Sequence, residues 1–130
     1  MITIGQLAKQ TGFTVVTLRY YEKLQLIQSQ RLENGYRVYR EEDITTLNLI
    51  KQAKQLGFSL TEIAEFIQLD EHVAKGRDVK ILLEKKLVRI EEQIAFLKQL
   101  KKTYESLLNS CSGDMPLEHC PIMHKLKSGE

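Results

Sequence analysis

The sequence predicts a mainly α-helical protein with a helix-turn-helix head, a small β-hairpin wing and a long helix near the carboxyl end. Three observations support this fold class. Two short capped segments meet at a Gly-containing turn, an Asn-Gly pair follows between alternating residues, and a heptad stripe occupies much of the second half. With 130 residues, the chain has room for one domain, or for one small domain followed by an oligomerisation arm.

Positive charge is concentrated at the amino end. Residues 1–40 contain six basic and two acidic side chains, a balance of +4, and the remaining 90 residues carry −2. Such a segment is typical of a surface that binds phosphates, although an ordinary solvated surface fits the charge count as well. The sequence has no signal-peptide pattern and no run of roughly 18 apolar residues, so we expect a cytoplasmic protein with reduced thiols and no membrane partner.

The first two predicted helices form the helix-turn-helix. Thr3 and Gln6 have the spacing of a capping box, and Thr11-Gly12 ends the first helix because Gly tolerates the left-handed conformation. Thr14 then caps a second helix that runs to about Lys23. A second helix in this position can enter the major groove of DNA, although helical hairpins without that role are common.

A hairpin is expected next, at Asn34-Gly35, where alternating residues flank the strongest short turn signal. The basic residues Arg31, Arg37 and Arg40 would extend the basic surface of the helices onto this wing. We expect Tyr39 to be a packing residue that anchors the wing.

Two more helices should follow the wing. Glu41-Glu42-Asp43 suits a helix start, where acidic groups interact favourably with the helix dipole, and Leu56-Gly57 ends that helix. Ser59, with Glu62 three residues on, caps the next one. Residues 70–77 then read as a polar linker.

Residues 78–108 are predicted to form one continuous helix of roughly 45 Å. Apolar residues recur at alternating spacings of four and three, at Leu83, Leu87, Ile90, Ile94, Leu97, Tyr104 and Leu108. Only Lys101 interrupts the stripe, at a position of the a type. One helix cannot cover such a seam by itself, so we expect a homodimer in which Lys101 helps to set register.

The tail, residues 109–130, contains Gly113, Pro116 and Pro121 and is expected to be a loop without helix. Its two cysteines, Cys111 and Cys120, can approach each other across this loop, with His119 and His124 beside the second thiol. In a reducing compartment this composition favours a metal site. A disulfide, a redox sensor and incidental cysteines are the alternatives that spacing alone leaves open.

The chain resembles the MerR family of bacterial transcription regulators. The matching segments are IGQLAKQTGFTVVTLRYYEKLQLI, RLENGYRVYREEDI and LNLIKQAKQLGFSLTEIAEFI, and the pair TLRYYE and NGYRxY makes the match specific. The resemblance implies a winged helix-turn-helix DNA-binding domain over residues 1–69, the linker at 70–77, a dimerisation helix at 78–108 and a metal-sensing loop and tail at 109–130. It also implies that the long helices pair as an antiparallel coiled coil.

For function, the resemblance implies a homodimer on double-stranded promoter DNA. In the effector-bound form the family's regulators bend and untwist the promoter, which brings its two elements into line for RNA polymerase and activates transcription. In the metal-sensing branch the activated genes serve metal homeostasis or efflux.

The DNA contacts implied by the resemblance fall on the second helix and on the wing: Thr14, Val16, Thr17, Arg19, Tyr20, Arg31, Asn34, Tyr36 and Arg37. Arg pairs with phosphate or with a guanine edge, and Thr and Tyr hydroxyls donate to phosphate oxygens. For Arg19 an ion pair with Glu22 is the alternative role. Tyr21 is expected in the core.

The metal-sensing relatives carry a two-cysteine loop at this point, and Cys120-Pro121-Ile122 matches it too. Sensors of divalent ions often add a partner cysteine near the position of Gly76, where this chain has no thiol, and copper(I) sensors lack that cysteine as well. His119 and His124 instead suit nickel or zinc, ahead of cobalt, so the predicted effector is a divalent ion, with copper(I) bound by Cys111 and Cys120 as the alternative. His72 is a possible further ligand across the dimer.

Other functions are less well supported by the residues. A thiol redox or electrophile regulator that uses the same cysteines is the main alternative. A drug sensor would need an apolar pocket, for which about 20 residues beyond the long helix are too few. No nucleophile–base set or cofactor loop is present, so an enzyme is not expected.

Overall fold

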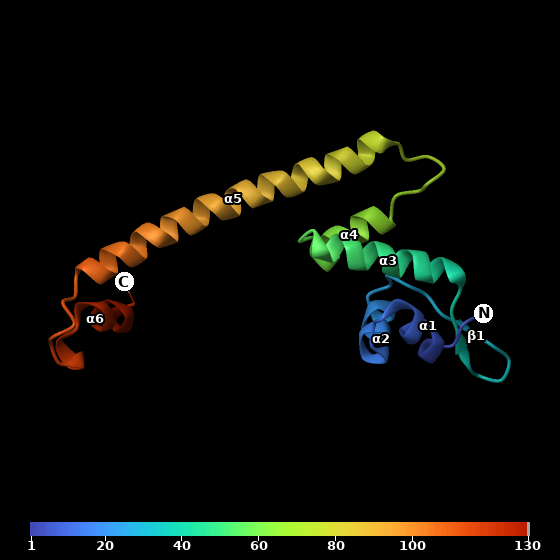
Figure 1. Ribbon diagram of the computed structural model, residues 1–130, viewed down its shortest axis with the longest axis horizontal. Helices are drawn as coiled ribbons and strands as arrows, with labels where there is room; N and C mark the ends of the chain where they lie inside the picture. Colours follow the sequence, from blue (N-terminus) through green and yellow to red (C-terminus); the bar gives the residue numbers. More distant parts are fainter. Residues whose placement is uncertain (130) are drawn as a thin grey trace. The chain divides into compact units, whose positions relative to one another are not determined.

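The computed structural model describes residues 1–129 and contains two compact units, one from Met1 to Leu83 and one from Glu84 onward. The first unit begins with α1 (Ile4–Thr11) and α2 (Val15–Lys23), which pack against each other (Figure 1). The predicted capping box is confirmed, because Thr3 Oγ1 accepts from the Gln6 N–H at 3.2 Å and the Thr3 N–H donates to Gln6 Oε1 at 3.0 Å.

The turn between the two helices is also as predicted. Gly12 has φ of +81°, and its N–H donates to the Ala8 carbonyl at 2.9 Å, so a residue without Cβ ends α1. Lys51 lies in α3 (Glu41–Gln55), and its Nζ donates to the Thr11 carbonyl of this turn at 2.8 Å. A cation at a helix carboxyl terminus interacts favourably with the helix dipole, so this contact helps to hold the helix-turn-helix in place.

The wing consists of β1 (Gln30–Arg31) and β2 (Arg37–Val38), paired antiparallel with Arg31 opposite Arg37. The Leu32 N–H donates to the Tyr36 carbonyl at 2.8 Å, which closes a three-residue loop with Gly35 at φ +87°. The hairpin prediction at Asn34-Gly35 is therefore confirmed. A bridge between Ile2 and Tyr39 ties the wing to the amino end of the chain.

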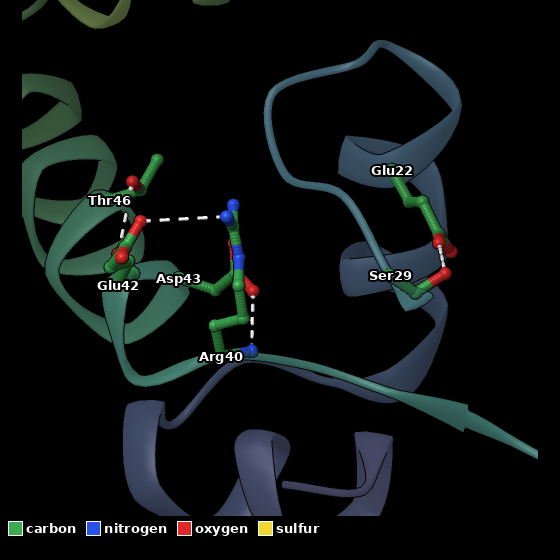
Figure 2. Close-up of polar contacts among 6 residues, drawn as sticks. All are labelled: Glu22, Ser29, Arg40, Glu42, Asp43 and Thr46. Atoms are coloured by element: carbon green, nitrogen blue, oxygen red, sulfur yellow. Dashed lines mark hydrogen bonds and ion pairs between the residues drawn. The ribbon is translucent and has the colours of Figure 1, made fainter. Parts of the chain in front are cut away.

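The next two helices are α3 (Glu41–Gln55) and α4 (Leu60–Ile67), in agreement with the predicted starts and ends. At the start of α3, the buried Asp43 carboxylate accepts from the Arg40 N–H at 2.8 Å, while the Arg40 guanidinium lies 3.6 Å from Glu42 (Figure 2). Ser59 and Glu62 form the reciprocal cap of α4, with hydrogen bonds of 3.2 and 2.9 Å.

One hydrophobic core joins these elements. Its fully buried side chains come from both short helices, the wing and both later helices: Leu7, Leu18, Tyr21, Tyr39, Leu47, Ile50 and Ile63. The predictions that Tyr21 is a core residue and that Tyr39 anchors the wing are both confirmed. Because α2 and the wing share this core, the side chains that point outward from them are held in fixed relation to one another.

The long helix α5 runs from Gly76 to Asn109, beginning two residues earlier than predicted. The difference arises because the Asp78 carboxylate accepts from the Lys75 N–H at 2.7 Å and caps the helix ahead of Gly76. The helix has no buried residue, and the predicted heptad stripe is exposed from Leu83 to Leu108. Within residues 1–129, no helix has both the length and the apolar character needed to cross a membrane.

The tail corrects the expectation of a loop without helix. A short 3₁₀ turn, η1 (Leu117–His119), leads into α6 (Pro121–Ser128). Pro121 occupies the first turn of α6, where the missing N–H costs no hydrogen bond, so this proline starts the helix. Gly113, with φ of +89°, makes the turn that precedes it.

Candidate functional site

Four basic side chains surround one acidic one in a surface hollow of about 450 Å³ between α2 and the wing. Arg19 and Lys23 come from α2, and Arg31 and Arg37 come from the two strands. Glu22 is the acidic residue among them. The hollow therefore has a positive balance, which is the electrostatic character of a surface that binds a phosphate backbone.

Glu22 joins the second helix to the wing. Its half-buried carboxylate accepts from Arg37 Nη1 at 3.2 Å and from the Tyr39 hydroxyl at 3.2 Å. It also accepts from the Ser29 hydroxyl, as drawn in Figure 2. The desolvation of Tyr39, together with the negative charge of Glu22, raises the pKa of that phenol. An ion pair with Glu22 is the alternative role that the sequence leaves open for Arg19, whereas the ion pair that Glu22 forms here is with Arg37.

The predicted contact residues on α2 lie at its amino-terminal end and along one exposed side. Thr14 caps the helix, since its Oγ1 accepts from the Thr17 N–H at 3.1 Å and its hydroxyl bonds Thr17 Oγ1 at 2.9 Å. With Thr17 as the acceptor in that bond, the Thr17 hydroxyl hydrogen is left for a phosphate oxygen. Val16 is 78% exposed and Tyr20 50%, so both can reach a nucleic acid.

On the wing, the predicted residues occupy the loop and the strand next to it. Tyr36 is 71% exposed. Asn34 Oδ1 accepts from the Tyr36 N–H at 3.1 Å, which shapes the turn and leaves the Asn34 amide NH₂ to donate elsewhere. A second hollow, of about 780 Å³, lies beside this loop, and both Arg19 and Arg37 contribute to its wall as well.

In the tail, sulfur atoms gather in the segment between α5 and α6. Cys111 Sγ lies 3.8 Å from Cys120 Sγ, and both cysteines are free thiols. Cys111 Sγ also donates to Met115 Sδ at 3.3 Å. The structure thus brings together the two predicted cysteines, and it adds a thioether that the predicted ligand set did not contain.

Cys120 is the residue that precedes α6, and the helix start acts on its thiol. Backbone N–H groups of Met123 and Ile122 bond to the sulfur and lower the pKa of Cys120, and the bond with Cys111 contributes in the same direction. Burial opposes this effect. The negative form of the sulfur, which is the form that binds metals, is therefore stabilised where α6 begins.

The predicted histidine ligands lie outside this sulfur cluster. His119 is 68% exposed, and its Nε2 lies 3.5 Å from Glu118 Oε1. His124 is exposed on α6, and His72 is exposed in the linker, where its backbone N–H donates to Asp70. Across residues 1–129 there is no group of three or more Cys, His, Asp or Glu side chains placed to hold a metal ion.

Residues 2–70 match the family described as MerR HTH family regulatory protein, and residues 44–107 match the one described as MerR, DNA binding. The chain belongs to the MerR family. This MerR protein is consequently a DNA-binding transcription regulator and not an enzyme, as expected from its sequence.

Curated relatives align with this MerR protein over nearly its whole length. The HTH-type transcriptional regulator ZntR of Escherichia coli K12 is 35% identical, with 99% of this chain and 94% of the relative covered. The HTH-type transcriptional regulator CueR of Escherichia coli O6:H1 is 35% identical, with 96% and 93% covered. The heavy metal-dependent transcription regulator 2 of Rhizobium meliloti is 32% identical, with 98% and 88% covered.

Solved structures agree with the fold. The transcription regulator PbrR691 from Ralstonia metallidurans CH34, in complex with lead(II), has a TM-score of 0.85 at 26% identity, covering 97% of this chain and 99% of that one. HiNmlR, a MerR family regulator lacking the sensor domain and bound to promoter DNA, has a TM-score of 0.53 at 28% identity, covering 84% and 88%. The predicted winged helix-turn-helix fold is therefore confirmed.

Two residues of the site were missing from the sequence prediction. Glu22 was considered only as a partner for Arg19, although its place in the motif TLRYYE put it beside the buried Tyr21 on the side that meets the wing. Met115 is the second, since the predicted ligand set contains only cysteines and histidines. The available signal was its position two residues after Gly113, where a tight turn can bring its side chain back toward Cys111.

Proposed function

We propose that this MerR protein is a metal-responsive regulator. As a homodimer it binds promoter DNA through α2 and the wing, and a transition metal ion bound in the tail makes it distort that DNA and activate transcription by RNA polymerase. The regulated genes serve metal homeostasis or efflux. The observation that carries the proposal is the pair of free thiols, 3.8 Å apart, immediately after the long helix.

The donor set fits a metal ion. Two thiols nine residues apart in sequence lie 3.8 Å from each other, and a thioether lies beside the first of them. A metal effector is also supported by two similar proteins. The Rhizobium meliloti relative is named a heavy metal-dependent transcription regulator, and PbrR691 is in complex with lead(II). Bound at the thiols, an ion would cross-link the end of α5 to the start of α6.

The residues of the tail determine what such a link changes. Cys111 comes two residues after α5 ends at Asn109, and Cys120 directly precedes Pro121 of α6. Fixing the two sulfurs to each other therefore fixes where α6, with its exposed Leu126, is held relative to the end of α5. Metal binding would thus change the packing of α6 against the end of α5. Because α5 is the proposed dimerisation helix, this local change can be passed to the dimer.

The exposed stripe of α5 supports the homodimer. Leu87, Leu97, Tyr104 and Leu108 are each more than half exposed, although helices of folded proteins normally bury such a stripe. A second copy of the same helix supplies a stripe of matching length. The DNA contacts at Thr14, Val16, Thr17, Arg19, Tyr20, Arg31, Asn34, Tyr36 and Arg37 remain part of this proposal.

Two donor sets compete for the metal. The first is the predicted nickel or zinc site, in which His119 and His124 join the thiols, with His72 as a possible ligand from the partner subunit. It requires the histidines to move, because residues 1–129 contain no group of three or more Cys, His, Asp or Glu side chains placed to hold an ion. The second is a copper(I)-type site made of sulfur alone, which matches the arrangement of Cys111, Cys120 and Met115 directly.

A titration of the reduced, full-length protein tests the proposal. Nickel(II), zinc(II) and copper(I) are added in competition, and binding is followed together with affinity for double-stranded DNA selected from a random library. We expect one ion per chain in the wild type and none in Cys111→Ser or Cys120→Ser. Leu117→Ser is the matched control, since it places a serine at an exposed position of the same loop without removing a thiol.

Two results would contradict the proposal in different ways. If the reduced protein binds no metal but an oxidant changes its DNA binding, the thiol redox regulator is the correct function. If His119→Ala and His124→Ala bind and respond to metal as the wild type does, the nickel or zinc assignment fails and the sulfur site stands.

A further inference from the structure

Three sulfur atoms, and not two, converge in the tail. Met115 Sδ lies 3.3 Å from Cys111 Sγ, which in turn lies 3.8 Å from Cys120 Sγ. Cys111, Met115 and Cys120 are half-buried, whereas residues 112–114 and 116–119 are exposed. The loop has therefore turned its sulfur-bearing side chains inward and its other side chains outward.

We propose that Met115 is a third sulfur ligand of the effector site and that the site consequently selects a soft monovalent ion of the copper(I) class. This inference rests on the metal-responsive function proposed above. It goes beyond that function by assigning a ligand that the two-cysteine pattern does not contain and by choosing between the competing donor sets.

The chemistry of the donors supports this choice. A thioether is an uncharged, polarisable ligand that binds soft ions such as copper(I) well and contributes little to zinc or nickel sites. Zinc in a closed site takes four strong donors from Cys, His, Asp or Glu. Within the described part of the chain no such group of three or more is assembled, and the ring nearest in sequence to Cys120, that of His119, lies against Glu118.

The backbone of the loop explains how Met115 reaches the thiol. Gly113 adopts a φ of +89°, a backbone conformation that residues with a Cβ rarely adopt. The Asp114 N–H bonds back to Ser112 Oγ at 3.4 Å, so the chain reverses between Cys111 and Met115. Pro116 then precedes η1, which carries the chain on to Cys120.

The competing role for Met115 is that of an apolar filler in a half-buried loop. Leucine fills nearly the same volume without the sulfur, so Met115→Leu separates the two roles. Met123→Leu is the matched control, because Met123 is also half-buried in the tail and contacts Cys120 through its backbone N–H, which the substitution keeps.

The experiment measures affinity and coordination directly on reduced, full-length protein. Copper(I) and zinc(II) affinities are obtained by competition with chromophoric chelators, and X-ray absorption at the copper edge counts sulfur neighbours. We expect Met115→Leu to lower copper(I) affinity on the order of tenfold, to remove one sulfur neighbour and to leave zinc(II) affinity unchanged. Met123→Leu should match the wild type in every readout.

A second variant tests the same idea in the opposite direction. Met115→His replaces the soft donor by a borderline one, so it should lower the preference for copper(I) over zinc(II). Far-UV circular dichroism and dimer mass verify that each variant folds as the wild type does.

The outcomes distinguish this inference from the function on which it rests. If the wild type binds copper(I) and Met115→Leu keeps the same affinity and the same sulfur count, Met115 is only a filler and the inference is overturned, while metal sensing stands. A wild type that prefers zinc(II) over copper(I) would likewise overturn the inference and leave metal sensing standing. If the reduced wild type binds neither ion, the proposed function itself fails.

Discussion

The carboxylate of Glu22 and the guanidinium of Arg37 lie 3.2 Å apart and connect the second helix of the helix-turn-helix to the second strand of the wing. Glu22 is 17% exposed and Arg37 50%, so the pair stands at the edge of the basic hollow. One face of Arg37 is held by the protein, and the rest of its guanidinium faces outward. A residue held in this way can meet a phosphate without losing much side-chain freedom.

Replacing Arg37 by Gln should weaken DNA binding and make it less sensitive to salt. Removal of one phosphate contact lowers the slope of log affinity against log salt by about 1. Fluorescence anisotropy over a series of salt concentrations measures both quantities. Arg40→Gln is the control, since Arg40 is engaged with Glu42 and Asp43 and should change the slope less. An unchanged slope in Arg37→Gln would remove Arg37 from the phosphate contacts.

The phenol of Tyr39 makes the stability of the head depend on alkaline pH. Burial and the charge of Glu22 raise the pKa of Tyr39 above its ordinary value of 10.0, so the folded chain holds this proton more tightly than the unfolded chain. The resulting contribution to stability is complete below pH 10 and is lost as the pH rises through the raised pKa.

Tyr39→Phe should therefore lower the free energy of unfolding at pH 7 by about 1 kcal/mol, the usual value of one hydrogen bond. The deficit should shrink above pH 10, where the wild-type phenol ionises beside Glu22. Urea unfolding at a series of pH values measures this difference. A deficit that stays constant to pH 12 would show that Tyr39 ionisation is not linked to folding.

Two glycines in the first helical pair should respond oppositely to the same substitution. Gly12→Ala places a Cβ on a residue with φ of +81° and should destabilise the protein by about 1–2 kcal/mol. Gly5 lies within α1, where an added Cβ meets no atom within 4 Å, and Gly5→Ala should stabilise by roughly 0.5 kcal/mol. Thermal unfolding compares the two; equal shifts in melting temperature would contradict the backbone argument.

Lys101→Leu should strengthen the homodimer. Lys101 interrupts the apolar stripe, and its Nζ lies 4.0 Å from the exposed carboxylate of Glu105. Leucine would continue the stripe and add buried apolar area in both copies, lowering the dimer dissociation constant on the order of tenfold. Sedimentation equilibrium gives this constant. Lys98→Leu is the control, because Lys98 follows Leu97 and lies off the stripe, and it should leave the dissociation constant nearly unchanged. An equally small effect of Lys101→Leu would show that Lys101 lies outside the interface.

Local signals made most of the head predictable. Thr3, Thr14 and Ser59 cap their helices as expected, because a cap depends on residues within one turn of chain. Gly12 and Gly35 likewise adopt the conformations that their neighbours indicated. Each of these features is decided over three or four residues, which is the range that a single sequence displays.

Contacts that depend on folding were harder to foresee. Glu22 had Arg19 as a near neighbour in sequence, yet it pairs with Arg37, fifteen residues away. The pairing follows from the bridge between Ile2 and Tyr39, which sets where the wing lies. In the tail, Pro121 indicates a helix break by composition but starts α6, since the proline ring is favourable in a first turn.

The sulfur site shows the same limit within a single loop. His119 is adjacent to Cys120 in sequence, but its ring lies against Glu118. Met115 is five residues from Cys120 and approaches Cys111 instead. The turn at Gly113 decides which side chains face inward, and this information is not contained in the list of potential ligands.

The uncovered stripe of α5 links the regulator's stability to its abundance. If this stripe is covered only by a second copy, unfolding and dissociation are one process, and mass action enters the free energy. Each tenfold dilution then costs about 1.4 kcal/mol per mole of dimer. The melting temperature should fall as the protein is diluted, and a cell that makes few copies would hold a less stable regulator than one that makes many.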